Sequence, residues 1–177
     1  MDIIEGGALP DDADWRGRLG LTFVPGKRDP ADSRPYWRDL TADVTSLRST
    51  WGVDALVLLL EDHELELLGV PEVVASLEVA GIEVVRLPIP DGGVPLDTSD
   101  MRAVLATVAG WLRDGRTVAV ACRGGLGRAG TFVACLCIDA GLDAEAAIAL
   151  ARQTRPGTIE TRRQEDFVRR WAATSGR

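Results

Sequence analysis

The stretch Thr117-Val-Ala-Val-Ala-Cys-Arg-Gly-Gly-Leu-Gly-Arg-Ala-Gly-Thr131 joins a run of small and branched aliphatic residues to a glycine-rich turn. The run before Cys122 is typical of a buried strand, and the residues from Ala129 onwards follow a helical pattern. A glycine-rich turn at such a junction directs backbone N–H groups inward, with the N-terminus of a helix behind them, and both features bind anions. The stretch therefore predicts an anion-binding loop between a strand and a helix.

Around this loop, short aliphatic runs alternate with segments of helical periodicity. The predicted strands cover residues 19–24, 55–60, 82–87 and 117–121. The predicted helices cover residues 40–51, 71–80, 101–112, 129–140, 144–152 and 162–173. Strands that alternate with helices are typical of an α/β fold with a largely parallel sheet. We expect a central sheet flanked by helices, and a C-terminal third that is entirely helical.

Length and composition predict one domain and exclude several classes of partner. A chain of 177 residues with 46% hydrophobic residues suits a single core, and we assign residues 1–18 to an acidic N-terminal tail and 19–177 to the domain. The net charge of -7 argues against binding to nucleic acid or to an anionic membrane. No apolar window reaches the roughly 18 residues of a membrane span. Three cysteines without disulfide or zinc spacing favour a reducing compartment, so we expect a cytoplasmic monomer.

Cys122 and Arg128 stand at the two ends of the anion-binding loop, six positions apart. The positive field of the loop favours the thiolate of Cys122, which is a strong nucleophile. The planar guanidinium of Arg128 has the shape to hold two phosphate oxygens. Asp91 follows a neighbouring predicted strand, and because the ends of parallel strands meet at one edge of a sheet, it is placed to protonate a leaving group. These residues predict cysteine-dependent cleavage of a phosphomonoester, with the substrate held by the loop residues Arg123, Gly124, Gly125, Leu126 and Gly127.

Two alternative readings use the same glycines. Gly125, Gly127 and Gly130 match the G-x-G-x-x-G fingerprint of dinucleotide-binding folds. That fold needs a further strand that ends in an acidic residue about 20 positions on, whereas only helices are predicted there. Gly125 and Gly130 also have the spacing of a nucleotide-binding P-loop, but Thr131 stands where that motif requires lysine. We disfavour both readings.

Three segments, in this order and spacing, resemble the dual-specificity branch of the protein tyrosine phosphatase superfamily, and within it the kinase-associated phosphatases. They are Gly20-Leu-Thr-Phe-Val-Pro-Gly26, Pro88-Ile-Pro-Asp-Gly-Gly93 and Gly124-Gly-Leu-Gly-Arg128. The resemblance extends over residues 19–172. It implies a protein tyrosine phosphatase-like fold and a phosphorylated protein substrate, with no metal and no organic cofactor. Phosphoinositides, phosphosugars and nucleotides stay open as alternative substrates.

The same resemblance implies a role for each site residue. Cys122 is the nucleophile that forms a phosphocysteine intermediate, Arg128 is the phosphate clamp, and Asp91 is first general acid and then general base. Gln164 matches the glutamine that positions the hydrolytic water. Arg123 has two readings, since an arginine at the edge of the loop either meets the substrate or forms a structural ion pair.

The sequence departs from the family pattern at two positions beside the loop. Ala121 stands where the family usually has a histidine, and Ala129 stands where a serine or threonine usually follows the arginine. The missing groups support the thiolate in the family, so turnover is affected more than phosphate binding. An alternative function is therefore a phosphate-recognition module with little turnover. Of the other candidate residues, Cys135 and Cys137 read as core and His63 as a solvated surface residue.

Overall fold

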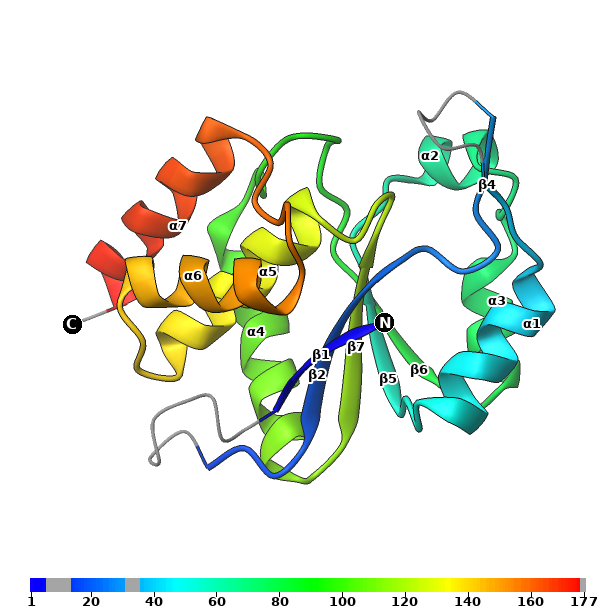
Figure 1. Ribbon diagram of the computed structural model, residues 1–177, viewed down its shortest axis with the longest axis horizontal. Helices are drawn as coiled ribbons and strands as arrows, with labels where there is room; N and C mark the ends of the chain where they lie inside the picture. The colour runs from blue at the N-terminus through cyan, green and yellow to red at the C-terminus, as the bar shows by residue number, and fades with distance from the viewer. Residues whose placement is uncertain (6–13, 31–35, 176–177) are drawn as a thin grey trace.

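The computed structural model describes residues 1–5, 14–30 and 36–175. A five-stranded sheet crosses the middle of the molecule, with α1 and α3 on one side and α4 to α7 on the other (Figure 1). Its strands are β1 (Asp2–Glu5), β2 (Arg18–Phe23), β7 (Thr117–Cys122), β5 (Ala55–Leu58) and β6 (Glu83–Arg86), in this spatial order. β1 is antiparallel to β2, and the other neighbours are parallel. The predicted α/β architecture with a largely parallel sheet is confirmed.

The N-terminal strand β1 was not predicted. Asp2–Glu5 pairs with β2, so that Ile4 lies opposite Leu19, and the Ile4 side chain is buried. The tail that we assigned to residues 1–18 therefore contributes a strand to the sheet at residues 2–5, while residues 6–13 lie outside the described part of the chain. In the sequence, two isoleucines between acidic residues are too short a run to predict a strand. Pairing with the edge of β2 decides the conformation here.

The helices lie where their periodicity placed them. They are α1 (Leu40–Thr45), continued by the π-helical turn η3 (Ser46–Thr50), α2 (Asp62–Leu67), α3 (Val73–Val79), α4 (Thr98–Arg113), α5 (Gly127–Asp139), α6 (Ala144–Thr154) and α7 (Arg162–Ser175). Of these only α2 was not predicted. A separate two-stranded ribbon joins β3 (Arg28–Asp29) to β4 (Tyr36–Trp37). In the described residues no strand follows β7, so the further strand that the dinucleotide fingerprint needs is missing.

The sheet is buried on both faces, which makes β7 a rigid base for the loop that follows it. Val118 and Val120 pack towards α4 and α5, whereas Ala119 and Ala121 pack towards the side of α1 and α3. The helix after the loop, α5, has every residue from Gly127 to Ile138 buried. Cys122 thus lies at the end of a central strand and immediately before a central helix.

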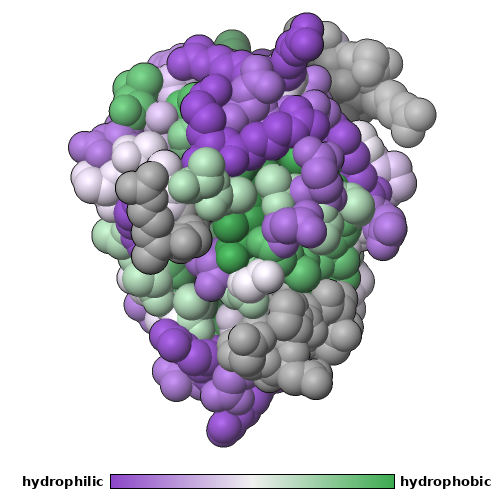
Figure 2. Space-filling model, turned by 90° about the vertical axis from the view of Figure 1, so that its left-hand side faces the viewer, coloured by the Kyte–Doolittle hydropathy of each residue, from purple (hydrophilic) through white to green (hydrophobic). Residues whose placement is uncertain are grey.

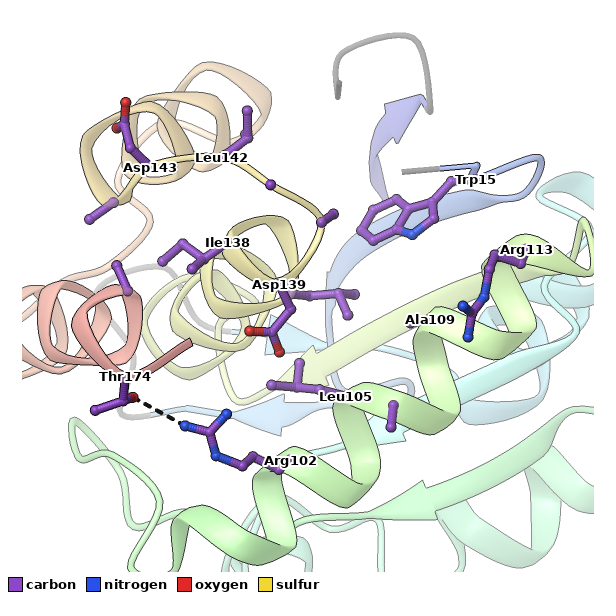
Figure 3. A pocket seen from close by; sticks show the side chains of 16 residues that line it. Trp15, Arg102, Leu105, Ala109, Arg113, Ile138, Asp139, Leu142, Asp143 and Thr174 are labelled. Carbon is purple, nitrogen blue, oxygen red and sulfur yellow. Dashed lines mark hydrogen bonds between the residues drawn. The ribbon is translucent and has the colours of Figure 1, made fainter. Parts of the chain in front are cut away.

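Within the described ranges, no helix has both the length and the apolarity that crossing a bilayer requires. A groove of about 960 Å³ lies between α4 and the ends of α5 and α7 (Figure 3). Figure 2 shows apolar residues at the centre of this side of the molecule, with hydrophilic residues above them. The residues that line the groove include none of the predicted site residues, so the groove is separate from the anion-binding loop.

Candidate active site

The loop after β7 folds back over the sulfur atom of Cys122. The backbone N–H of Gly125 donates a hydrogen bond to Cys122 Sγ at 3.2 Å, which stabilises negative charge on the sulfur. Gly125 has a φ of +69°, and a Cβ there would lie 2.5 Å from the backbone carbonyl group of Thr22. Only glycine meets both conditions, because it adopts positive φ readily and has no side chain. The glycine at this position therefore lets the loop close on the sheet.

The N-terminus of α5 points its free N–H groups into the same loop. Leu126, the residue before the helix, makes no side-chain hydrogen bond that caps it. The first N–H groups of a helix have no partner within the helix, and they carry its positive dipole end. An anion in the loop would satisfy them. The predicted anion-binding loop has this geometry.

Arg128 is buried, and it is held from behind by Glu64 of α2. Its Nη1 donates to Glu64 Oε2 at 2.6 Å and its Nη2 to Glu64 Oε1 at 2.8 Å, a two-pronged pairing that fixes the guanidinium plane. Nη1 also donates to the carbonyl oxygen of Ile89 at 2.9 Å. The residue is 2% exposed, so Arg128 does not line an open surface cleft. Burial lowers the pKa of Arg128, but the hydrogen bond to Glu64 and nearby negative charges outweigh it and raise that pKa overall.

Glu64 is a site residue that the sequence analysis missed. It is 3% exposed, and its carboxylate also accepts from the backbone N–H of Glu61 in a capping box at the start of α2. Burial raises the pKa of Glu64, but the hydrogen bonds from Arg128 and from the Glu61 backbone lower that pKa more, so the carboxylate is charged. In the sequence, Glu64 stands among charged neighbours that suggest a solvated face, and His63 is indeed exposed. One signal was available in the sequence. Glu64 follows the acidic residue Glu61 by three positions, and this spacing is typical of a helix start.

Asp91 lies at the mouth of the loop, beside both of its arginines. One carboxylate oxygen is 2.9 Å from Arg128 Nη2, and the other is 3.6 Å from Arg123 Nη1. The side chain is 57% exposed, so this carboxylate faces solvent where a leaving group would stand. Asp97, by contrast, caps α4 by accepting the N–H of Ser99 at 2.7 Å. The structure therefore brings Asp91 to Arg128, whereas the carboxylate of Asp97 is already used to cap α4.

Arg123 forms the structural ion pair that was one of its two readings. Its Nε donates to Asp29 Oδ2 at 2.9 Å, and the Asp29 side chain is 3% exposed. Lys27 Nζ lies 3.4 Å from the same carboxylate oxygen. Arg123 is thus anchored to the segment after β2, and its Nη1 faces Asp91.

Gln164 is fully buried between the start of α7 and the loop of Asp91. Its Oε1 accepts the backbone N–H groups of Glu160 at 3.0 Å and Thr161 at 3.2 Å. Its Nε2 donates to the carbonyl oxygen of Gly93 at 3.1 Å. A Cβ on Gly127 would lie 2.9 Å from Nε2, so the amide is next to the phosphate loop. Gln164 is therefore not an ordinary residue of a helix surface.

The two alanines beside the loop are both core residues. Ala121 packs in the cluster on one face of the sheet and Ala129 in the cluster on the other, and each is 0% exposed. Thr131 is the nearest hydroxyl further along α5 that could replace the missing one. Its Oγ1 donates to the carbonyl oxygen of Gly127 at 2.8 Å, so the single hydroxyl hydrogen is already used.

We predict that Cys122 reacts with oxidants faster than either other cysteine. Burial raises the pKa of Cys135 well above its ordinary value and raises the pKa of Cys137 to about 12, so both stay protonated thiols at neutral pH. After mild peroxide, mass spectrometry should find the first sulfenic acid at Cys122, and added phosphate should slow the reaction. Earlier oxidation of Cys135 or Cys137 would contradict the placement of the site.

Comparisons with known proteins show which family the chain resembles. Residues 38–168 match the family model PTP-SAK, described as Swiss Army Knife protein, DSP-PTPase phosphatase domain. The chain is 29% identical over 153 residues to cyclin-dependent kinase inhibitor 3 of Rattus norvegicus, covering 85% of this chain and 69% of that protein. The human protein of the same name is 28% identical over the same length.

Two solved structures share the fold. A kinase-associated phosphatase, crystallised with its catalytic-site cysteine replaced by serine, superposes with a TM-score of 0.79 at 26% identity, covering 89% of this chain and 88% of that one. Tk-PTP in its active form superposes with a TM-score of 0.67 at 28% identity, covering 85% of this chain and 98% of that one.

Proposed function

Since the chain belongs to the DSP-PTPase phosphatase domain family, we propose that it hydrolyses phosphoprotein substrates in two steps at Cys122. The observation that carries the assignment of residues is the buried pair of Arg128 and Glu64, which aims a guanidinium at the loop around the Cys122 sulfur. Such a pair is costly to bury, and here it presents the rest of the guanidinium to an anion. The other groups of the site divide the reaction between them.

In the first step the thiolate of Cys122 attacks phosphorus, and the bond from phosphorus to the leaving oxygen breaks. Arg128 and the loop N–H groups hold the non-bridging oxygens, whose charge they neutralise as the bond order changes. Asp91 gives its proton to the leaving oxygen. In the structure Asp91 forms an ion pair with Arg128 Nη2, and the incoming phosphate takes the place of the carboxylate beside Nη2 and displaces it towards the leaving group.

In the second step water attacks the phosphocysteine, and the sulfur leaves as the thiolate. Asp91, now a carboxylate, takes a proton from the water. Gln164 uses both lone pairs of Oε1 and one N–H of Nε2 on the backbone, which leaves the second N–H of Nε2 to orient the water beside Gly127. The reaction needs no metal ion in this scheme.

The proposed substrate is a protein that carries phosphotyrosine or phosphothreonine/phosphoserine. Support comes from the names of two similar proteins, a cyclin-dependent kinase inhibitor and a kinase-associated phosphatase. We propose that the chain acts as a monomer in the cytoplasm, where its three free thiols stay reduced. The net charge of -7 favours a partner recognised by a local site over one held by general charge, such as nucleic acid.

An assay with a generic aryl phosphate in the presence of a metal chelator tests the proposal. We expect metal-independent turnover that Cys122→Ser removes. A phosphate-recognition module, the function favoured by Ala121 and Ala129, would instead bind a phosphopeptide and release no phosphate. A panel of phosphopeptides and phosphoinositides, captured with Cys122→Ser as a trap, identifies the substrate class. Retention of phosphoinositides alone would overturn the assignment of a protein substrate.

We predict a burst in the first turnover, because Ala129 lacks the hydroxyl that steadies the departing thiolate. One hydrogen bond to a charged group contributes about 1.5 to 3 kcal/mol, which makes the second step roughly ten to a hundred times slower. Thr131 does not compensate, since its hydroxyl donates to Gly127. Rapid mixing with a good aryl phosphate should release leaving group to near one equivalent per enzyme, and Ala129→Ser should remove the burst and raise the steady-state rate. Linear release from the first turnover, with no gain in Ala129→Ser, would refute this reading.

A further inference from the structure

Arg155 joins the phosphate loop to the N-terminal strand. It is the residue that ends α6. Its Nη2 donates to the carbonyl oxygen of Gly124 at 3.0 Å, and its Nη1 pairs with the carboxylate of Asp2 in β1. The Arg155 side chain is 20% exposed, whereas the Asp2 side chain is 44% exposed, so the ion pair lies at the edge of the protein surface. None of the site residues described above is seen to contact both the phosphate loop and β1 in the described residues.

The contact fixes the orientation of one particular peptide unit. The carbonyl of Gly124 and the N–H of Gly125 belong to the same planar trans peptide, in which they point in opposite directions. While Arg155 holds the oxygen on one side, the N–H on the other side is directed at Cys122 Sγ, 3.2 Å away. The position of this donor therefore depends on Arg155.

On the side of Gly124 this peptide has little else to hold it, whereas on the other side Gly125 packs closely against the backbone of Thr22. The peptide lies between two glycines, which have no side chains to restrict rotation. A Cβ added at Gly124 would have no atom nearer than Leu126 Cδ1 at 4.0 Å, so the space there is open. If the peptide rotated, its carbonyl oxygen would face the sulfur and repel both the thiolate and a phosphate. The hydrogen bond from Arg155 to the Gly124 carbonyl opposes this rotation.

The guanidinium of Arg155 is not fully satisfied by hydrogen bonds where it lies. Its Nε is buried and has no hydrogen-bond partner among the described residues. A buried donor without an acceptor destabilises a fold, so this placement has a cost in stability. Arg86 has an Nε of the same kind, so it is the contact with Gly124 that distinguishes Arg155.

We propose that Arg155 is a positioning residue that keeps the Gly124–Gly125 peptide oriented for phosphate transfer, with Asp2 of β1 fixing the guanidinium. The inference rests on the proposed phosphatase function. It makes the N-terminal strand a support of the active site, because Asp2 lies on that strand. The positive charge of Arg155 also polarises the peptide and strengthens the Gly125 N–H as a donor.

The test compares Arg155→Met, which keeps the length of the side chain, with Arg116→Met as a matched control. Arg116 makes the same kinds of contact at the other end of the sheet, to the carbonyl of Asp54 and the carboxylate of Glu83. With para-nitrophenyl phosphate we expect Arg155→Met to lower kcat about tenfold and to change KM by less than about twofold, since the donor acts mainly on the transition state. The inhibition constant of orthovanadate should rise in proportion. Arg116→Met should change neither.

Two further variants separate positioning from folding. Arg155→Lys should recover part of kcat, because an ammonium group still donates to Gly124, and Asp2→Asn should lower kcat about threefold while the fold is kept. A kcat of Arg155→Met within about twofold of Arg116→Met, or a loss that only follows the folded fraction in thermal melts, would overturn the proposal. If the wild-type protein shows no turnover, the proposed function fails. The positioning role of Arg155 is then tested by the affinity for tungstate, measured by tryptophan fluorescence. Weaker affinity in Arg155→Met then supports the positioning role, and equal affinity refutes it.

Discussion

Arg128→Lys will lower kcat/KM for an aryl phosphate by about a hundred- to thousandfold, the largest effect that we expect for a change of side chain with conserved charge. The guanidinium of Arg128 uses one side for Glu64 and the other for phosphate, and a lysine ammonium cannot present two fixed pairs of donors. Steady-state kinetics measure the effect.

Stability has to be measured alongside, because Arg128 is 2% exposed and its replacement disturbs a buried pair. Arg86→Lys is the matched control. Arg86 also pairs with a carboxylate of α2, that of Asp62, and donates to a backbone carbonyl, that of Leu60 at 2.8 Å, but it does not contact the phosphate loop. We expect Arg86→Lys to melt earlier and to keep its turnover. If Arg128→Lys keeps activity within about threefold of wild type, Arg128 is not the phosphate clamp.

Asp91→Asn will slow hydrolysis of substrates with poor leaving groups by about a hundredfold or more. An asparagine keeps the shape of the side chain and lacks the acidic proton, so a leaving group that needs protonation departs slowly. A good leaving group departs as an anion and is affected little. A series of aryl phosphates with graded leaving-group acidity therefore gives a steeper dependence in Asp91→Asn than in wild type.

Asp97→Asn is the control for this prediction. Asp97 lies in the same connection between β6 and α4, but its carboxylate caps α4 through the N–H of Ser99. Asparagine is also a good cap, so activity and stability should change little. Equal losses for good and poor leaving groups in Asp91→Asn would mean that Asp91 orders the loop and is not the acid.

The sequence predicted the parallel sheet and the phosphate loop because both depend on local patterns. Aliphatic runs, helical periodicity and a glycine-rich turn are visible within a few residues, and the strand before Cys122 and the helix after it lie where these patterns put them. Gly125 shows how strict such a pattern is, since the backbone of Thr22 leaves no room for a side chain.

What the sequence could not predict are contacts between distant segments. Glu64 reaches Arg128 across the ends of two strands, and nothing in its charged surroundings distinguishes it from a solvated residue. The pairing of Asp2–Glu5 with β2 likewise depends on a free sheet edge and not on strand propensity. Burial of Arg128 and Gln164 follows from the same cause, because the elements that cover them are far away in the chain.

The place of β7 in the sheet also matters while the chain is being synthesised. β7 is the last strand in the sequence, yet it lies between β2 and β5 and pairs with both. Until Thr117 and the residues after it have left the ribosome, β2 and β5 each have an unpaired edge. Aliphatic side chains are then exposed on both faces of β5 and on the Leu19 and Leu21 face of β2. Such edges associate with other chains. We therefore expect a fragment that stops before Thr117 to aggregate, because the central strand that pairs with both edges is missing from it.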